Sequence, residues 1–205
     1  MSLMQFLFIM GIIVEASSGA LAAGRKQMDF FGVIVIASIT GLGGGTVRDV
    51  LLGNFPLLWV KQPIYILYTI TAAALTIYAA NFIGRRRQLF LMLDALGLAT
   101  FSIVATERGL DLGLAPPIIV VFAMVTGIAG GMIRDILCND MPLVLRKEFY
   151  AVISLFASVI FLSLHYLEID FFITEMFTLL VAFGLRLAAI KWRLCLPSFN
   201  YTQED

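Results

Sequence analysis

The 205-residue sequence has few charges, two cysteines and a single histidine. Only 14% of its residues are charged, and 14 basic side chains balance 14 acidic ones. An ordinary soluble domain has about 25% charged residues, so this composition excludes a cytosolic enzyme and a nucleic-acid binder with a basic face. Cys138 and Cys195 are far apart and have no histidine near them, which excludes a metal site and a disulfide framework. The sequence also contains no HExxH motif, nucleophile–base pair or nucleotide loop, so we expect neither an enzyme nor a cofactor.

Apolar residues dominate the sequence. They make up 60% of the chain, and the mean hydropathy is +0.97. A membrane-spanning helix needs about 20 apolar residues, and such stretches occur at 3–23, 30–55, 63–84, 88–107, 115–138, 149–167 and 171–190. The sequence therefore predicts an all-α polytopic membrane protein, a single membrane domain over 1–205 with seven transmembrane helices in the lipid bilayer. The first stretch follows no basic segment, so we expect a retained helix and not a cleaved signal peptide.

The basic residues between these stretches indicate the orientation of the chain. With seven crossings, nine of them fall on one side and only Lys61 and Arg108 fall on the other. The nine are Arg25, Lys26, Arg85, Arg86, Arg87, Arg146, Lys147, Lys191 and Arg193. Short cytoplasmic loops of membrane proteins are rich in lysine and arginine. We therefore predict an outward amino terminus and a cytoplasmic carboxyl terminus (N-out/C-in).

The sequence repeats itself after 86 residues. GLGGGTVRDVLLGNFPL at 41–57 aligns without a gap with GIAGGMIRDILCNDMPL at 127–143, and eight of the 17 positions are identical. We divide the chain into repeat A at 1–84, repeat B at 87–170, a seventh helix at 171–193 and a short cytoplasmic tail at 194–205. Each repeat holds three spans, an odd number, so the second copy must cross the membrane in the opposite sense. Transporters often use such inverted repeats, with the working site near the interface between the copies.

Each repeat carries a glycine cluster in its second helix, where glycine costs about 1 kcal/mol relative to alanine. Three explanations compete. The glycines could allow close helix packing, form a nucleotide-binding loop, or break the helix so that freed backbone groups line a polar path. The nucleotide loop fails because Thr46 stands where GxGxxG needs its final glycine. Glycines followed by Arg-Asp in both repeats favour broken helices, with Thr46 as the cap of a half-helix and Asp49 in its first turn.

Several ionisable residues lie inside the predicted helices. From the 1.5 Å rise per residue, we expect Arg48–Asp49 and Arg134–Asp135 near opposite mouths of the path, too far apart to exchange partners. Asp94 falls at the depth of Arg134, and we expect these two to pair. Glu15 lies about a turn from the middle of the first helix. Ionisable groups at such depths usually pair or face water, although arginines near a helix end can instead extend to the interface.

The GGxxRD signature in both repeats resembles that of a known family. The segments at 18–56 and 94–142 resemble the bacterial membrane family with paired glycine transporter domains, which is related to the trimeric intracellular cation (TRIC) channels. The resemblance implies an inverted-repeat fold in the bacterial inner membrane and a homotrimer. It also implies glycine-broken second and fifth helices that line a path through each protomer. Two positions depart from the family pattern: Glu15 stands where an aromatic residue is usual, and Ala129 replaces a glycine.

The candidate path residues combine this motif with the intramembrane charges. They are Gly41, Gly43, Gly44, Gly45, Thr46, Arg48, Asp49, Gly127, Gly130, Gly131, Arg134, Asp135, Asp94 and Glu15. The leading hypothesis is passage of a small zwitterion such as glycine, with half-helix amide groups binding its carboxylate and Asp94 or Glu15 binding its ammonium group. The alternative is a TRIC-type monovalent cation channel, for example for potassium. A third hypothesis is a structural or regulatory membrane protein whose glycines only pack helices.

Overall fold

The computed structural model describes residues 3–80, 82, 86–145, 149–192 and 194, and these residues form helices and no strands. The helices are α1 (Leu3–Arg25), α2 (Phe30–Leu51), α3 (Leu58–Lys61), α4 (Ile64–Ala80), α5 (Arg86–Asp111), α6 (Pro116–Leu137), α7 (Ala151–Tyr166) and α8 (Phe171–Trp192), with a 3₁₀ turn at Leu143–Leu145. Arg85, Arg146, Lys147, Arg193 and the tail from 195 onward lie outside the described residues.

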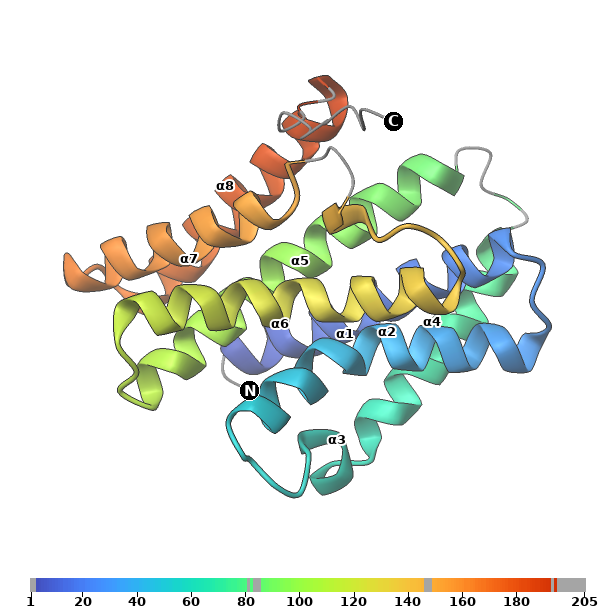
Figure 1. Cartoon of the computed structure of the whole chain (residues 1–205), viewed down its shortest axis with the longest axis horizontal. Coiled ribbons are helices and arrows are strands. Elements are labelled where there is room, and N and C mark those ends of the chain that lie inside the picture. The colour runs from blue at the N-terminus through green and yellow to red at the C-terminus, as the bar shows by residue number, and fades with distance from the viewer. Residues whose placement is uncertain (1–2, 81, 83–85, 146–148, 193, 195–205) are drawn as a thin grey trace, which may run out of the picture.

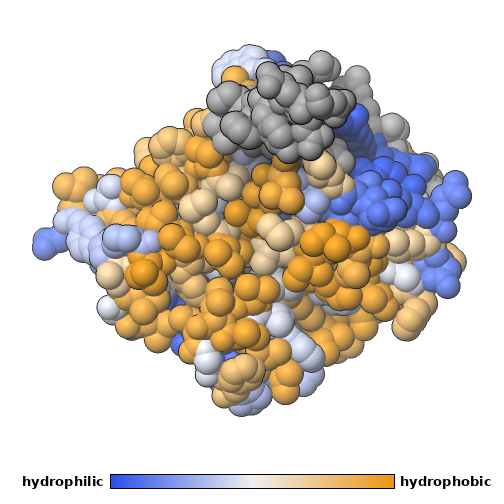
Figure 2. All heavy atoms as spheres, viewed as in Figure 1, coloured by the Kyte–Doolittle hydropathy of each residue, from blue (hydrophilic) through white to orange (hydrophobic). Residues whose placement is uncertain are grey.

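The long helices have the dimensions of membrane spans. Five of them, α1, α2, α5, α6 and α8, are 22 to 26 residues long and apolar enough to cross a bilayer, and α4 and α7 are shorter apolar helices. Each predicted stretch therefore holds one apolar helix, five of them long and two shorter, and the prediction of an all-helical membrane protein is confirmed. Figure 2 shows apolar side chains over most of the visible surface, as expected for a chain whose sides face lipid. The number of crossings and the orientation stay predictions.

Four helices form the centre of the molecule. Both α1 and α6 pack against α2 and α5, while α4 lies against α1 and α2, and α7 and α8 lie against α5 (Figure 1). The helices α2 and α6 run in opposite directions (Figure 1), and their ends keep the 86-residue spacing of the sequence repeat. Phe30 and Pro116 begin them, and Leu51 and Leu137 end them. The two helices that carry the glycine clusters therefore run through the centre of the molecule in opposite directions.

The same turn ends both of these helices. Gly53 has a φ of 63°, and Asn139, its counterpart after α6, has a φ of 51°. Glycine and asparagine adopt this left-handed conformation more readily than other residues. In each turn the following N–H returns to the helix, to the carbonyl of Asp49 or Asp135 at 2.8 Å, as at many helix ends. The turn directs the next segment of chain back toward the Arg-Asp motif of its own repeat.

The glycine clusters lie where α2 and α6 cross. A Cβ on Gly44 would lie 2.6 Å from the Thr126 carbonyl oxygen, and one on Gly130 would lie 2.5 Å from the Thr40 carbonyl oxygen. A Cβ on Gly43 would lie 3.4 Å from the Gly130 Cα. At Gly44 and Gly130 only a hydrogen atom fits, so these two glycines allow the helix backbones to touch.

The expected breaks in the second and fifth spanning helices are therefore wrong. Both α2 and α6 continue as single α-helices through their glycines. The Thr46 hydroxyl caps no half-helix, because it donates to the Leu42 carbonyl at 2.8 Å and accepts from the Trp59 indole at 3.1 Å. Asp49 lies in the last turn of α2 and not in the first turn of a half-helix. The cost of the helical glycines is offset by close backbone packing, which a break at the crossing would remove.

Gly41 and Gly127 make an equivalent contact with the first helix of each repeat. A Cβ on Gly41 would lie 2.8 Å from the Ile12 carbonyl oxygen in α1, and one on Gly127 would lie 3.3 Å from the Leu98 carbonyl oxygen in α5. Ile12 and Leu98 are themselves 86 residues apart. The sequence repeat is thus matched by a repeat of backbone contacts.

Replacing Gly44 or Gly130 by alanine is expected to destabilise the protein by about 1–3 kcal/mol, because overpacking a tight site costs this much. The matched control is Gly184→Ala in α8, where a Cβ would meet nothing within 4 Å and helix propensity rises by about 1 kcal/mol. Thermal unfolding in detergent measures both changes. Equal melting temperatures for Gly44→Ala and Gly184→Ala would contradict the packed crossing.

Candidate functional site

In repeat A, Arg48 and Asp49 form a buried ion pair. The Arg48 Nε and Nη2 atoms donate to Asp49 Oδ1 at 3.0 and 2.8 Å. The second Asp49 oxygen, Oδ2, accepts the backbone N–H of Leu58 at 2.9 Å, which attaches the start of α3 to the end of α2. The Arg48 guanidinium carbon lies 5.4 Å from the centre of the Phe8 ring, within the range of a cation–π contact.

In repeat B, Arg134 binds two carboxylates. Its Nε donates to Asp135 Oδ1 and its Nη1 to Asp94 Oδ1, both at 2.8 Å, and Nη1 also donates to the Ser18 hydroxyl at 2.9 Å. Asp135 Oδ2 accepts the N–H of Leu143 at 3.0 Å, as the equivalent aspartate does in repeat A. The structure thus pairs Arg134 with Asp94 as expected. Among the described residues each arginine pairs with the aspartate of its own repeat, not with that of the other.

Glu15 joins the repeat B cluster from α1. Its Oε2 atom lies 3.2 Å from the Ser18 hydroxyl and 3.9 Å from Arg134 Nη1. Glu15, Asp94, Arg134 and Asp135 are each at most 3% exposed. The site therefore holds one cation and three carboxyl groups inside the protein, and we call these four residues the Arg134 cluster.

Burial also excludes the interpretation that the two arginines simply extend to the membrane interface. Arg48 is 5% exposed and Arg134 is fully buried. Both guanidinium groups turn into the protein and are held by carboxylates and by aromatic rings, since the Arg134 guanidinium carbon lies 4.6 Å from the Phe90 ring centre.

The two arginines have different neighbours because two positions differ between α1 and α5, the first helices of the two repeats. At each of these positions one helix has an aromatic residue and the other has an acid. Phe8 in α1 corresponds to Asp94 in α5, and Glu15 corresponds to Phe101, each 86 residues later. The Phe8 and Phe101 rings contact each other edge to face, with centres 6.1 Å apart. The two acids instead lie together at Arg134. One arginine therefore has aromatic surroundings and the other has acidic surroundings.

Three members of the Arg134 site are absent from the residues predicted from the sequence. Ser18 binds the guanidinium, Phe90 stacks on it, and the Tyr150 hydroxyl lies 3.2 Å from where a Cβ on Gly131 would stand. Extending the 86-residue alignment into the first helix of each repeat would have shown that Phe8 aligns with Asp94 and Glu15 with Phe101. No comparable signal marks Tyr150, which precedes α7.

The structure divides the predicted path residues into three groups. Gly41, Gly43, Gly44, Gly127 and Gly130 pack helix backbones together, and the charged residues form the two arginine sites. Gly45 and Gly131 lie beside these sites, 3.9 and 3.5 Å from the respective arginine Nη2 when a Cβ is placed on them. Thr46 is separate, because it lines an apolar cavity of about 370 Å³ beside Trp59.

Each Arg-Asp motif reaches a cavity at the end of its own helix. The cavity after α2 has a volume of about 440 Å³, and its lining includes Phe8, Arg48, Asn54, Gln62 and Arg108. The cavity after α6 has a volume of about 260 Å³, and its lining includes Arg25, Arg87, Asp135 and Asp140. Because α2 and α6 run in opposite directions (Figure 1), the glycine crossing separates the two cavities.

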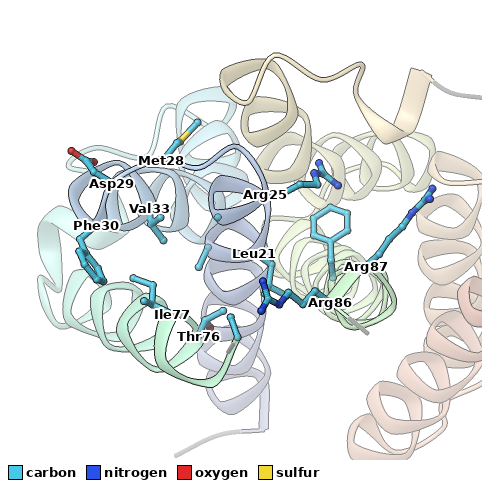
Figure 3. A pocket seen from close by; sticks show the side chains of 14 residues that line it. Leu21, Arg25, Met28, Asp29, Phe30, Val33, Thr76, Ile77, Arg86 and Arg87 are labelled. Atoms are coloured by element: carbon cyan, nitrogen blue, oxygen red, sulfur yellow. The ribbon is translucent and has the colours of Figure 1, made fainter. Parts of the chain in front are cut away.

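A third cavity, of about 570 Å³, lies among the ends of α1, α2, α4 and α5. Figure 3 shows three arginines along it, Arg25, Arg86 and Arg87, together with the apolar side chains of Leu21, Val33 and Ile77. None of the predicted path residues is among its lining residues. It lies next to the Arg134 site, because Arg25, Arg87 and Phe90 line both this cavity and the cavity after α6.

An exposed ion pair joins α1 to the end of α6 at the smaller cavity. Asp140 accepts from Arg25 Nη2 at 2.6 Å and from Lys26 Nζ at 2.8 Å. The hydrogen bond from Lys26, together with the positive charge of Arg25, lowers the pKa of Asp140 below its usual value of 3.8.

Comparison with known proteins identifies the family. The sequence profile of the glycine transporter family matches the chain twice, at residues 5–81 and 91–166. The chain belongs to this family. The two matches begin 86 residues apart, which is the spacing of the sequence repeat.

Relatives of this glycine transporter family member are membrane proteins. The inner membrane protein YadS of Escherichia coli K12 is 36% identical over 199 residues, which cover 96% of each chain. The TRIC trimeric intracellular cation channel orthologue from Rhodobacter sphaeroides superimposes with a TM-score of 0.90 at 33% identity, over 95% of this chain and 100% of that one. A prokaryotic TRIC channel solved in 0.5 M KCl gives a TM-score of 0.86 at 32% identity, over 94% and 98%. The protein is thus a multi-pass bacterial inner membrane protein with a TRIC-like fold.

Replacing Arg134 by glutamine is expected to destabilise the protein by about 3–5 kcal/mol, because removing one partner leaves buried carboxylates without their cation. Arg108→Gln is the control, since Arg108 is 42% exposed and its pair with Asp111 measures 3.7 Å, and an exposed pair contributes about 0–1 kcal/mol. Chemical unfolding in detergent measures both. A loss below about 1 kcal/mol for Arg134→Gln would show that the cluster does not depend on its cation.

The lowered pKa of Asp140 predicts a small dependence of stability on pH. A carboxylate whose pKa falls on folding stabilises the folded state above its unfolded pKa, and this contribution is lost as pH falls through the folded value. The melting temperature should therefore fall between about pH 5 and pH 3, with Asp140 contributing under about 1 kcal/mol because the pair is exposed. Asp140→Asn and Lys26→Met should both flatten this part of the curve. An unchanged curve in both variants would contradict the assignment.

Proposed function

We propose that the protein is a monovalent cation channel of the TRIC type in the bacterial inner membrane. The observation that carries this proposal is the agreement with a TRIC channel orthologue, at a TM-score of 0.90 and 33% identity, over nearly the whole chain. In the proposal the chain crosses the membrane seven times as an inverted 3+3 repeat plus a seventh helix. Its amino terminus faces outward, and three copies form a homotrimer with one path in each protomer.

The proposed path connects the two cavities through the crossing of α2 and α6. Arg48–Asp49 and Arg134–Asp135 stand at its two ends, and Gly43, Gly44 and Gly130 stand at its centre. The acids of the Arg134 cluster favour cations, because three carboxyl groups surround one guanidinium and acidic side chains attract cations in pores.

The backbone contacts at the crossing are the closed gate in this proposal. Gly44 touches the Thr126 carbonyl and Gly130 touches the Thr40 carbonyl. Glycines also make this segment the weakest part of each helix. Bending or separation of α2 and α6 at these positions would expose backbone carbonyls to a passing cation, and carbonyl oxygens are suitable ligands for potassium.

A second candidate is passage of glycine itself. The family profile that matches both halves of the chain is described as a glycine transporter, and the path residues offer the two charges that a zwitterion needs. Since α2 and α6 are continuous, the carboxylate of such a solute would meet Arg48 and not the half-helix ends expected from the sequence. Its ammonium group would meet Asp94 or Glu15.

Recordings from the purified protein in planar bilayers and liposomes separate the two candidates. Wild type should give ohmic potassium currents. Asp135→Asn should lower potassium conductance about tenfold, equivalent to about 1.4 kcal/mol, because Asp135 lines the cavity after α6. Glu168→Gln is the control and should conduct as wild type does, since Glu168 is exposed after α7 and lines neither cavity.

The same preparation should be tested for uptake of labelled glycine. Saturable glycine uptake without single-channel currents would overturn the channel proposal in favour of the second candidate. A folded protein that gives neither current nor uptake would overturn both and leave a structural or regulatory role.

A further inference from the structure

The Arg134 cluster has fewer cations than its carboxyl groups require. Glu15, Asp94 and Asp135 surround one guanidinium, and all four side chains are at most 3% exposed. With all three acids ionised, the site would hold two excess negative charges out of water. Uncompensated buried ions cost several kcal/mol each, and a buried carboxylate usually avoids this cost by taking up a proton.

Geometry identifies Glu15 as the acid without a cation of its own. Arg134 donates to Asp135 and to Asp94 at 2.8 Å, whereas Glu15 Oε2 lies 3.9 Å from Arg134 Nη1, beyond hydrogen-bond distance. Glu15 Oε2 has the Ser18 hydroxyl at 3.2 Å. Glu15 Oε1 has no hydrogen-bond partner in the part of the chain that the structure describes. Such an orphaned buried oxygen is costly for an ionised group and less so for a neutral acid.

Packing around Glu15 leaves room for a proton but not for a coordinated metal cation. Glu15 Oε1 rests on Gly97 of α5, where a Cβ would overlap it. Gly97 is therefore the residue that allows an acid at position 15. A bound metal cation needs several oxygen ligands around it, whereas a proton needs one oxygen. Asp94 Oδ2 also has no hydrogen-bond partner among the described residues.

The other charged groups near Glu15 do not replace a proton. Asp94 from α5 and Asp135 from α6 repel a negative charge on Glu15, and Arg134 from α6 attracts it. Tyr150, ahead of α7, interacts with the same acids and with the buried Arg186 of α8, whose guanidinium carbon lies 4.5 Å from the centre of the Tyr150 ring. On the α2 side, the residues that lie against Ile12, Ala16 and Gly19 of α1 include Ala37, Thr40 and Gly41, which are uncharged.

We infer that Glu15 is a proton-binding site and that its carboxyl group is protonated in the packed cluster. The carboxylate takes one H⁺ from solvent and becomes a neutral acid, so that the cluster keeps two negative charges against one positive charge. Loss of this proton adds a third negative charge beside the path. The effect on conduction rests on the proposed channel function: we expect potassium conductance to rise as pH rises and Glu15 ionises.

Infrared spectroscopy tests the proton without any transport assay. The carbonyl band of protonated carboxylic acids is compared at neutral pH in wild type, Glu15→Gln and Asp140→Asn. Glutamine has the shape of the neutral acid, so Glu15→Gln should keep the wild-type melting temperature and lose the share of the band that one carboxyl contributes. Asp140→Asn should keep the whole band, because Asp140 is paired with Lys26 and Arg25.

The expected effect of Glu15 ionisation on conduction is tested by measuring potassium conductance between about pH 6 and pH 9, on either side of neutrality. Wild type should conduct more at the upper end, and Glu15→Gln should lose this rise and conduct throughout as wild type does at the lower end. An undiminished infrared band in Glu15→Gln, or a loss of stability as large as that of Arg134→Gln, overturns the proton site. The same pH dependence in both proteins overturns its effect on conduction. A diminished band without potassium currents from wild type overturns the channel proposal and leaves the proton site standing.

Discussion

The direct contact between the backbones of α2 and α6 is the constraint on which the rest of the structure depends. Gly44 and Gly130 bring each helix against a carbonyl of the other, and this fixes how closely the two helices approach. Arg48 and Arg134 each follow one of these glycines by four residues, about one helical turn. Since the helices run in opposite directions, a single packed point places the two arginines on opposite sides of itself. Each guanidinium therefore pairs with the aspartate of its own motif and not with that of the other.

The aspartates of the two motifs connect this helix crossing to the loops. Asp49 and Asp135 each use one oxygen to accept from the neighbouring arginine and the other to accept a backbone N–H of the segment that follows the helix. A carboxylate that accepts from a cation and from the main chain makes strong, charge-assisted hydrogen bonds on both sides. The arginine, the helix end and the wall of the adjacent cavity are thereby held as one unit. This explains in physical terms why Arg and Asp recur together in both repeats.

The sequence was sufficient for the long helices and for the pairing of Arg134 with Asp94, because apolar length and depth along a helix follow directly from residue positions. It was not sufficient for the glycines. A run of glycines weakens a helix and also admits a neighbouring backbone, and the outcome depends on which atoms of another helix arrive there. Thr40 and Thr126 supply those atoms through their backbone carbonyl groups. Every residue has such a carbonyl, so the residue type does not reveal the contact. The different surroundings of the two arginines could have been found, since Phe8 and Asp94 occupy the same position of the repeat.

The two repeats have similar backbones but an unequal distribution of charge, because acids and aromatic residues occupy each other's equivalent positions in α1 and α5. Phe8 and Phe101 lie in contact with each other, and Phe8 also faces Arg48, while Glu15 and Asp94 lie together at Arg134. In the proposed channel, a cation approaching from one end would meet an arginine covered by a ring, and from the other end an arginine outnumbered by acids. Fixed charge that is unequal along a narrow path raises the local cation concentration at one mouth only. In the proposed channel, such a path would make the protein a rectifier: reversing the membrane voltage would change the size of the current as well as its direction.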